Sequence, residues 1–392
     1  MTPLQQKPPG IIVKLFLAFL RLGLTAFGGP AMIAYIHELA VTRKGWLCEE
    51  SFKQGVAVSQ TIPGATAMQV AAYVGLRSGG PWGALAAYIG FGLPAFLLMA
   101  MLAALYQGAH ELPAVVSLFK GLQVIVIALV ANAAFNFGRG TIKIRQDILL
   151  GLGVTVFLVL HGNPTIAILV SALLGLPLYR KRAFKIKEAA ATSPGLSLGD
   201  FTTPLLLAAT LLAGMLLLFL VDRRLFDLSV VMTRVDLFAF GGGYGSVPLM
   251  FNEVVNTRHW LDSKVFMDGI ALGQVTPGPI VITATFVGYL LARLPGALVG
   301  TVSIFAPSLI LLTAMIPCFD RLQGSLLFHR MMHGVLVSFV GLLLSVTLRF
   351  ILAIPWDISR FVIVLLALAA LRCKMDILWV VLVGSALSVL LL

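Results

Sequence analysis

The chain has 392 residues, of which 59% are hydrophobic and only 11% are charged, and its mean hydropathy is +1.00. A soluble domain carries about 25% charged residues, so this composition excludes a soluble globular protein and makes the lipid bilayer its first partner. The chain has a net charge of +12, which in a membrane protein indicates cytoplasmic loops rich in Lys and Arg. We therefore expect no nucleic-acid partner. The three cysteines lie far apart, and no cofactor or metal-ligand motif is present, so we expect no disulfide framework, no metal and no cofactor.

Apolar stretches recur along the whole chain, and about 20 such residues suffice to cross a bilayer. They predict an all-α polytopic membrane protein with thirteen spans, at 11–28, 56–76, 82–107, 114–137, 147–161, 164–178, 203–221, 229–249, 269–291, 296–317, 331–352, 358–371 and 376–392. The sequence leaves open whether 56–76 and 269–291 cross fully or re-enter. The polar stretch 179–202 is predicted to be a basic cytoplasmic linker.

The distribution of Lys and Arg predicts the orientation of these spans. With the N-terminus inside, the thirteen-span count places sixteen of them in inner loops and seven in outer loops. Because cytoplasmic loops collect basic residues, the N-terminus is expected inside and the C-terminus outside. Arg43, Lys44, Arg223 and Arg224 fall on the outer side in this count and oppose that orientation.

An internal repeat is the strongest signal in the sequence. RLGLTAFGGP at 21–30 recurs as RVDLFAFGGG at 234–243, and WLCEESFKQGVAVSQTIPG at 46–64 recurs as WLDSKVFMDGIALGQVTPG at 260–278. The offset stays at 213 or 214, which predicts two copies of one structural unit. We divide the chain into an N-terminal repeat at 1–178, the linker at 179–202, an unmatched connecting span at 203–228 and a C-terminal repeat at 229–392.

The unmatched span makes the number of crossings between equivalent points odd, so the second copy is predicted to be inverted. Inverted-topology repeats are typical of secondary transporters, whose substrate site lies near the midplane where the copies meet. A gene duplication without a transport role is the alternative interpretation.

Two helix-breaking motifs occur in each copy, at 27–30 and 61–64 and again at 240–243 and 275–279. Gly and Pro interrupt helices, and a helix that restarts after a break points free N–H groups and the positive end of its dipole at the gap. The four matched breaks therefore predict broken or re-entrant helices around an anion site. A kink, or close packing at small residues, is the alternative.

Arg21 and Arg234 occupy matched positions six residues before each Phe-Gly-Gly and lie inside apolar runs. An unpaired Arg in mid-membrane costs at least about 2.5–3.5 kcal/mol, so such residues usually face the protein interior. A guanidinium group suits an oxyanion because it donates bidentate hydrogen bonds. Asp236 is close enough in sequence to pair with Arg234, whereas Arg21 has no acid nearby.

Other matched polar residues are candidates for substrate binding or for proton coupling. Gln60 and Gln274 precede the breaks and are expected to bond either substrate oxygens or the broken backbone. Proton-coupling candidates are the matched pair Lys120 and His333 and the roughly matched pair Glu38 and Glu253. The alternative is that these groups reach the interface or form solvated faces.

The motifs RLGLTAFGGP, WLCEESF and SQTIPGATAMQ, repeated as FAFGGGYGSVPL, HWLDSKVF and LGQVTPGPIVITATFVGYL, resemble those of the chromate ion transporter family in its long, two-domain form. The resemblance implies a multi-pass protein of the bacterial inner membrane that exports chromate, driven by the proton-motive force, and confers chromate resistance. A carrier of sulfate or another oxyanion is the nearest alternative. A membrane-embedded lipid-modifying enzyme and a passive anion channel are alternatives from other classes. We expect no enzymatic activity, and a homodimer is one option for the oligomeric state.

The substrate-binding candidates combine the breaks with the polar groups beside them. They are Arg21, Thr25, Phe27, Gly28, Gly29, Pro30, Gln60, Pro63, Gly64, Arg234, Phe240, Gly241, Gly242, Gly243, Gln274, Thr276, Pro277 and Gly278. In the resulting hypothesis, the two arginines attract the dianion and the breaks supply backbone N–H groups. Alternating access then rocks one repeat against the other.

Overall fold

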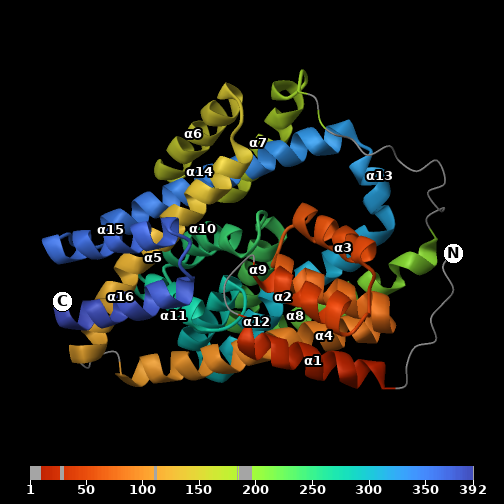
Figure 1. The fold of residues 1–392 in the computed structure, drawn as a ribbon, viewed down its shortest axis with the longest axis horizontal. Helices are drawn as coiled ribbons and strands as arrows, with labels where there is room; N and C mark the ends of the chain where they lie inside the picture. The colour runs from red at the N-terminus through yellow and green to blue at the C-terminus, as the bar shows by residue number, and fades with distance from the viewer. Residues whose placement is uncertain (1–9, 27–30, 110–112, 183, 185–196, 392) are drawn as a thin grey trace.

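The computed structural model describes residues 10–26, 31–109, 113–182, 184 and 197–391, and these residues form helices and short connections without β-strands (Figure 1). The helices are α1 (Ile11–Thr25), α2 (Ala31–His37), α3 (Glu49–Thr61), α4 (Thr66–Ala109), α5 (Pro113–Thr141), α6 (Arg145–Val159), α7 (Pro164–Leu178), α8 (Thr202–Val221), α9 (Arg223–Phe238), α10 (Ser246–Phe251), α11 (Ser263–Val275), α12 (Thr283–Met315), α13 (Phe319–Gln323), α14 (Leu326–Ala353), α15 (Ile358–Arg372) and α16 (Ile377–Leu391). Five of the helical stretches are long and apolar enough to cross a membrane. The predicted all-α polytopic class is confirmed.

The helices of the two copies correspond one for one at an offset near 213. The pairs are α1 with α9, α2 with α10, α3 with α11, α4 with α12, α5 with α14, α6 with α15 and α7 with α16. A π-helical turn follows α2 as η1 (Glu38–Arg43) and follows α10 as η4 (Asn252–Thr257). Both turns end alike, because Trp46 N donates to Ala40 O and Trp260 N donates to Val254 O, each at 2.8 Å. Only α8 lacks a counterpart among the longer helices that the structure describes.

The predicted spans 56–76 and 269–291 do not cross but fold back as helical hairpins. Gly55 on α3 packs against the ring of Tyr73 on the first arm of α4, with the break at 62–65 between them. Gly269 on α11 packs in the same way against the ring of Phe286 on α12. These residue pairs would lie roughly 25 Å apart on a straight helix.

The predicted spans 229–249 and 11–28 fail to cross for the same reason. Arg234 on α9 forms an ion pair with Glu253 on η4, although the two would lie about 28 Å apart on a straight helix. In the first copy, α1 and the return segment formed by α2 and η1 line one cavity together. The breaks reverse the chain direction, and apolar composition alone does not distinguish a hairpin from a crossing helix.

A second reversal divides α4 and α12 into two arms. Gly80 has a φ of 70° in α4, and Arg293 has a φ of 53° in α12. Gly75 therefore packs on the backbone of Gly83, and Gly288 packs on that of Gly296. Nine helical segments of the described chain remain as candidate crossings: the second arms of α4 and α12, α5 to α8 and α14 to α16. The prediction that 11–28 and 229–249 cross was wrong, and for 56–76 and 269–291, which the sequence left open, the structure shows the re-entrant alternative.

The ends of these helices define two faces. One is the linker face, which we define as the face where the described residues that flank the linker lie. There Arg182 pairs with Asp147, at the start of α6, at 3.5 Å, and Arg330 donates to Arg180 O at 2.8 Å. At the opposite face, Arg349 donates to Leu158 O at 2.9 Å. The hairpins of the first copy begin at the linker face and those of the second copy at the opposite face, so the copies are inverted.

The hairpins also change the charge count. Arg43 and Lys44 now lie at the linker face, which removes two of the four residues that opposed the predicted orientation. Arg258 and Lys264 move from the predicted inner side to the opposite face. At the linker face the described basic residues are Arg43, Lys44, Lys53, Arg77, Arg139, Lys143, Arg145, Arg180, Lys181, Arg182, Arg321, Arg330, Arg372 and Lys374, against Arg223, Arg224, Arg258, Lys264, Arg293 and Arg360 at the opposite face. The excess supports a cytoplasmic linker face.

The last two crossing helices of each copy pack on the other copy. α6 and α7 lie against α14, and α15 and α16 lie against α5, at the upper and left side of Figure 1. Small residues permit this close approach: Gly334 packs on the backbone of Ser171, Gly341 on that of Gly151, and Gly121 on the side chain of Ser388. The hairpins of both copies, with α8, make up the rest of the molecule. The site described next lies where these hairpins meet.

Candidate functional site

The two copies exchange a pair of backbone hydrogen bonds at their breaks. Ala26 follows α1 and Ala239 follows α9, where each helix stops. Gly64 N donates to Ala239 O at 2.8 Å, and Gly278 N donates to Ala26 O at 3.0 Å. Each hairpin tip of one copy is thus bonded to the broken helix of the other, and this reciprocal crossing marks the centre of the molecule.

Glycine is required at both hairpin tips. Gly64 has a φ of 111° and Gly278 a φ of 116°, which L-residues with a side chain rarely adopt. A Cβ on Gly64 would overlap the Ser308 hydroxyl, and one on Gly278 would lie 2.9 Å from the Ala95 Cβ. The prediction that these two N–H groups face an anion was wrong, because each is already bonded to a carbonyl of the other copy. Pro63 and Pro277, beside them, have no N–H to offer.

The break at 240–243 leaves other backbone donors. Gly241 and Gly242 have φ values of 81° and 83°, and no N–H of either donates a hydrogen bond to a described residue. Gly242 faces the hydroxyl of Thr66, at the start of α4. Gly243 opens a short 3-10 turn. The equivalent break of the first copy, with Phe27, Gly28, Gly29 and Pro30, lies outside the described residues.

Arg234 finds a different partner from the one predicted. Its guanidinium pairs with the carboxylate of Glu253, whose side chain is 7% exposed. Asp236 points elsewhere and accepts hydrogen bonds from the Ser308 hydroxyl. The predicted pairing of Arg234 with Asp236 was wrong, because residues two apart on a helix lie on different sides of it.

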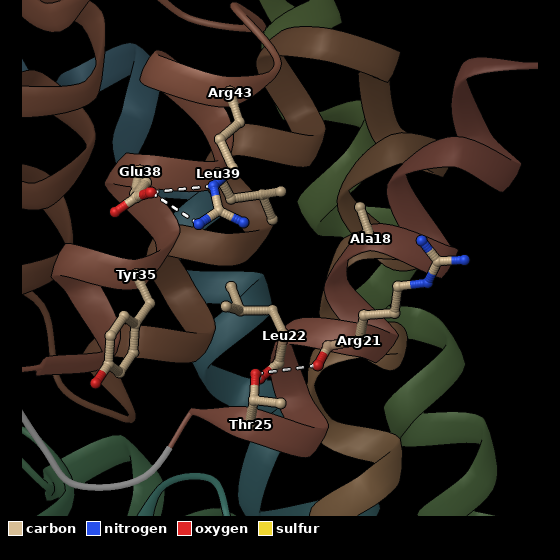
Figure 2. Close-up of a pocket in the computed structure, with 8 residues that line it drawn as sticks. All are labelled: Ala18, Arg21, Leu22, Thr25, Tyr35, Glu38, Leu39 and Arg43. Carbon is tan, nitrogen blue, oxygen red and sulfur yellow. Dashed lines mark hydrogen bonds and ion pairs between the residues drawn. The ribbon is translucent and has the colours of Figure 1, made fainter.

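Arg21 lines an open cavity of about 360 Å³ between α1 and its return segment. The cavity is also lined by Thr25, Tyr35, Glu38 and Arg43, and Figure 2 shows the Arg21 side chain directed away from the Glu38–Arg43 pair. Glu38 accepts from Arg43 at 2.9 Å, so Arg21 has no acidic partner among the described residues. The volume has room for a tetrahedral oxyanion together with several waters, since each water needs about 30 Å³.

The remaining predicted binding residues are divided between bonded and exposed positions. Gln274 donates to the Tyr244 hydroxyl at 3.1 Å, whereas Gln60 is exposed. Thr25 and Thr276 turn their hydroxyls to backbone carbonyls of the preceding turn, at Arg21 and Gly273. Phe240 packs edge-on against Phe339, with ring centroids 6.2 Å apart.

The four proton-coupling candidates do not form one cluster. Lys120 is exposed near the start of α5, towards the opposite face. His333 lies near the linker face, where its Nε2 is 2.9 Å from Asp147 Oδ1 and 2.6 Å from Arg182 Nη1. Glu38 and Glu253 are each paired with an arginine. Lys120 is thus exposed, and the other three candidates are in ion pairs. Their part in proton coupling stays a prediction.

Two buried carboxyl groups were not among the candidates. Asp236 has no exposed surface, and Asp268 is 4% exposed. Asp268 accepts from the Tyr106 hydroxyl at 2.9 Å and from the Gln123 amide at 2.8 Å. The signal that could have identified both is an acid inside an otherwise apolar helix, and in the case of Asp236 the predicted pairing with Arg234 obscured it.

Comparison with known sequences identifies one family across both copies. The family described as "Chromate transporter" matches residues 13–176 and 226–389, which are the two repeats at the offset of 213. No solved structure matches the chain.

Several curated proteins are similar over nearly the full length. An uncharacterised transporter of Methanocaldococcus jannaschii is 45% identical over 97% of this chain and 94% of its own length. A chromate transport protein of Cupriavidus metallidurans is 30% identical over 92% of this chain and 89% of its own. Another, of Pseudomonas aeruginosa, is 32% identical over 87% of this chain and 81% of its own.

Proposed function

Because the chain belongs to the chromate transporter family, we propose that it is a secondary active transporter that exports chromate across the inner membrane, driven by the proton-motive force. The observation that carries this proposal is the reciprocal crossing of the hairpin tips, with an arginine of each copy close by. Arg21 and Arg234 each lie five residues before the carbonyl that receives the other copy's hydrogen bond, about 7–8 Å along the helix.

In this proposal Arg21 is the first group to meet the anion. Its guanidinium has no acidic partner among the described residues and is directed away from the Glu38–Arg43 pair (Figure 2), while the residue itself lines an open cavity on the hairpin that begins at the linker face. If that face is cytoplasmic, as its basic residues support, the cavity loads from the cytoplasm, which is the direction that export requires. The N–H groups of Gly241 and Gly242, which donate to no described residue, are backbone donors available for the oxyanion.

Alternating access follows from the inverted copies. The two hairpin sets are equivalent in sequence, so each can take the arrangement that the other has now. Exchange of the two arrangements would close the cavity at Arg21 and open the matched one at Arg234. No residue in this scheme forms a covalent bond to the substrate.

Chromate uptake into everted membrane vesicles tests the proposal. Energised vesicles containing the wild-type protein should accumulate chromate, and an uncoupler should abolish the accumulation. Arg21→Ala should lose it, whereas Lys14→Ala, two helical turns earlier on α1, should retain it. Excess sulfate as a competitor tests the nearest alternative substrate. A well-expressed wild type that accumulates no chromate would refute the assigned ion, and accumulation that survives the uncoupler would refute the assigned energy source.

A further inference from the structure

Asp236 is a buried carboxyl group without a counter-ion. It has no exposed surface, and the Ser308 hydroxyl lies 2.8 and 2.6 Å from its two oxygens. Among the described residues no Lys, Arg or His lies within ion-pair distance of it. Ser308 also donates its backbone N–H, but both of these donors are uncharged and neither supplies a counter-charge. A carboxyl group that carries its own hydrogen fits this site, whereas a buried carboxylate would lack compensation.

The helices packed around Asp236 contribute no compensating charge. α8 and α10 contain no ionisable residue. On α12 the neighbour is the Ser308 hydroxyl, and on α4 the only titratable neighbour is Tyr88, which donates to Phe305 O at 2.7 Å. On α9 itself, Arg234 is committed to Glu253.

This carboxyl group is linked to the crossing of the two copies through Ser308. Gly64, the hairpin tip of the first copy, lies against the Ser308 hydroxyl, and its N–H bonds Ala239, three residues after Asp236. Beside it, Gln69 donates to Pro63 O at 2.6 Å, while its own Oε1 is buried with no partner. A change in the charge of Asp236 would therefore act on the contact between α9, α12 and the opposing hairpin tip.

The site exists in only one copy. The positions equivalent to Asp236 and Ser308 are Gly23 and Ala95, and the Ala95 methyl lies where a Cβ on Gly278 would point. The molecule thus has two crossing points of the same backbone geometry, but only one of them has a group that can bind a proton.

We propose that Asp236 binds and releases the coupling proton, with Ser308 as its hydrogen-bond partner; this inference rests on the proposed proton coupling. A proton from water on one side forms an O–H bond with the carboxylate. That same bond breaks on the other side, where water receives the proton. Chromate itself undergoes no chemical change in this step.

Two transport modes of one variant test the inference. Reconstituted Asp236→Asn should lose proton-driven accumulation of chromate, because the amide does not ionise, yet retain chromate–chromate exchange across vesicles without a gradient. Asp268→Asn is the matched control, since it neutralises an equally buried carboxyl group near the opposite face, and it should keep both modes.

Several outcomes would overturn the inference. Asp236→Asn that still accumulates chromate against a gradient would do so, and so would a folded variant that has lost exchange together with accumulation. If Asp236→Asn does not fold, Ser308→Ala keeps the carboxyl group and must shift the pH of half-maximal accumulation; an unchanged pH profile would count against the assignment. Wild-type accumulation that resists an uncoupler would instead refute the proposed function, and so distinguishes the two failures.

Discussion

The two hairpin sets of this protein have matched sequences but different surroundings. In the second copy Arg234 is paired with Glu253, and the pair shares with Pro164 and Thr165 at the start of α7 a space of only about 10 Å³, although the Arg234 side chain is 44% exposed. In the first copy Glu38 is paired with Arg43 instead, and the space beside Arg21 is about 360 Å³. The matched helix α16 does not line that space.

The two copies therefore have matched sequences but different conformations around the matched arginines. Arg234 is held in an ion pair beside a small space, whereas Arg21 lines a large one and has no acidic partner among the described residues, although both hold the same position in the repeat. In the proposed cycle, the structure represents the state that is open at the linker face and closed at the opposite face.

The largest expected effect comes from the hairpin tips. Gly64→Ala would place a methyl group on the Ser308 hydroxyl in a backbone conformation with a φ of 111°, so we expect a loss of about 3 kcal/mol in the free energy of unfolding. Gly278→Ala meets only the Ala95 methyl and should cost about 2 kcal/mol. Denaturant titration in mixed micelles compares them, and equal losses would show that backbone strain alone sets the cost.

The next effect concerns the two arginines. Arg234→Ala leaves the Glu253 carboxylate buried without its partner, and we expect a loss of about 2 kcal/mol. Arg21→Ala removes an exposed group and should change stability by less than about 0.5 kcal/mol while abolishing transport. The same titration measures both, and the double variant Arg234→Gln with Glu253→Gln serves as the control that removes both charges. A large loss in Arg21→Ala would contradict the asymmetry.

Thiol labelling measures the openness directly. Tyr35 is 46% exposed and its counterpart Leu249 is 4% exposed. After Cys48, Cys318 and Cys373 are replaced by Ser, Tyr35→Cys should react at least about tenfold faster than Leu249→Cys, because reaction at a buried position requires local opening. An imposed gradient that favours the other state should reverse the order. Equal rates at both positions in every condition would refute the alternating arrangement.

The smallest effect is expected at the exposed end of the first hairpin. Glu49 is exposed, and hydrogen bonds from His37, at 2.6 Å, and then from Lys53 lower its pKa. Its contribution to stability is therefore present above the normal pKa of a glutamate and is lost as the pH falls through the lowered value. Glu49→Gln should slightly flatten the dependence of stability on pH in that acidic range. A large change near neutral pH would show that the pair is more than a surface contact.

Much of this architecture could be predicted from sequence patterns. The offset of 213 or 214 predicted the seven helix pairs, and the odd number of crossings predicted the inversion. The breaks predicted broken or re-entrant helices, but which of these segments turn back could not be predicted, because apolar length and Gly-Pro breaks are the same whether the chain continues across the membrane or turns back. The basic residues contained a clue, since Arg43 and Lys44 were on the expected side only if the first two segments re-enter.

The site was less accessible to sequence reasoning. The breaks and the two arginines were identified, but the N–H groups of Gly64 and Gly278 are used between copies, and such a long-range bond leaves no local pattern. Glu253 was recognised as polar but not as the partner of Arg234, because the pairing depends on the hairpin. Asp236 was associated with its neighbour in sequence, whereas its actual partner, Ser308, lies 72 residues away.

The helix without a counterpart has a consequence for how the protein is made. α8 packs on α9 and α12, yet Pro204 is its only fully buried residue. During synthesis it is the segment that carries the start of the second copy to the other side of the bilayer, so that Gly278 can meet Ala26 when the later helices insert. An unrelated apolar helix of the same length should serve this purpose equally well. Deleting α8 would instead insert two parallel copies, whose hairpin tips could never reach each other.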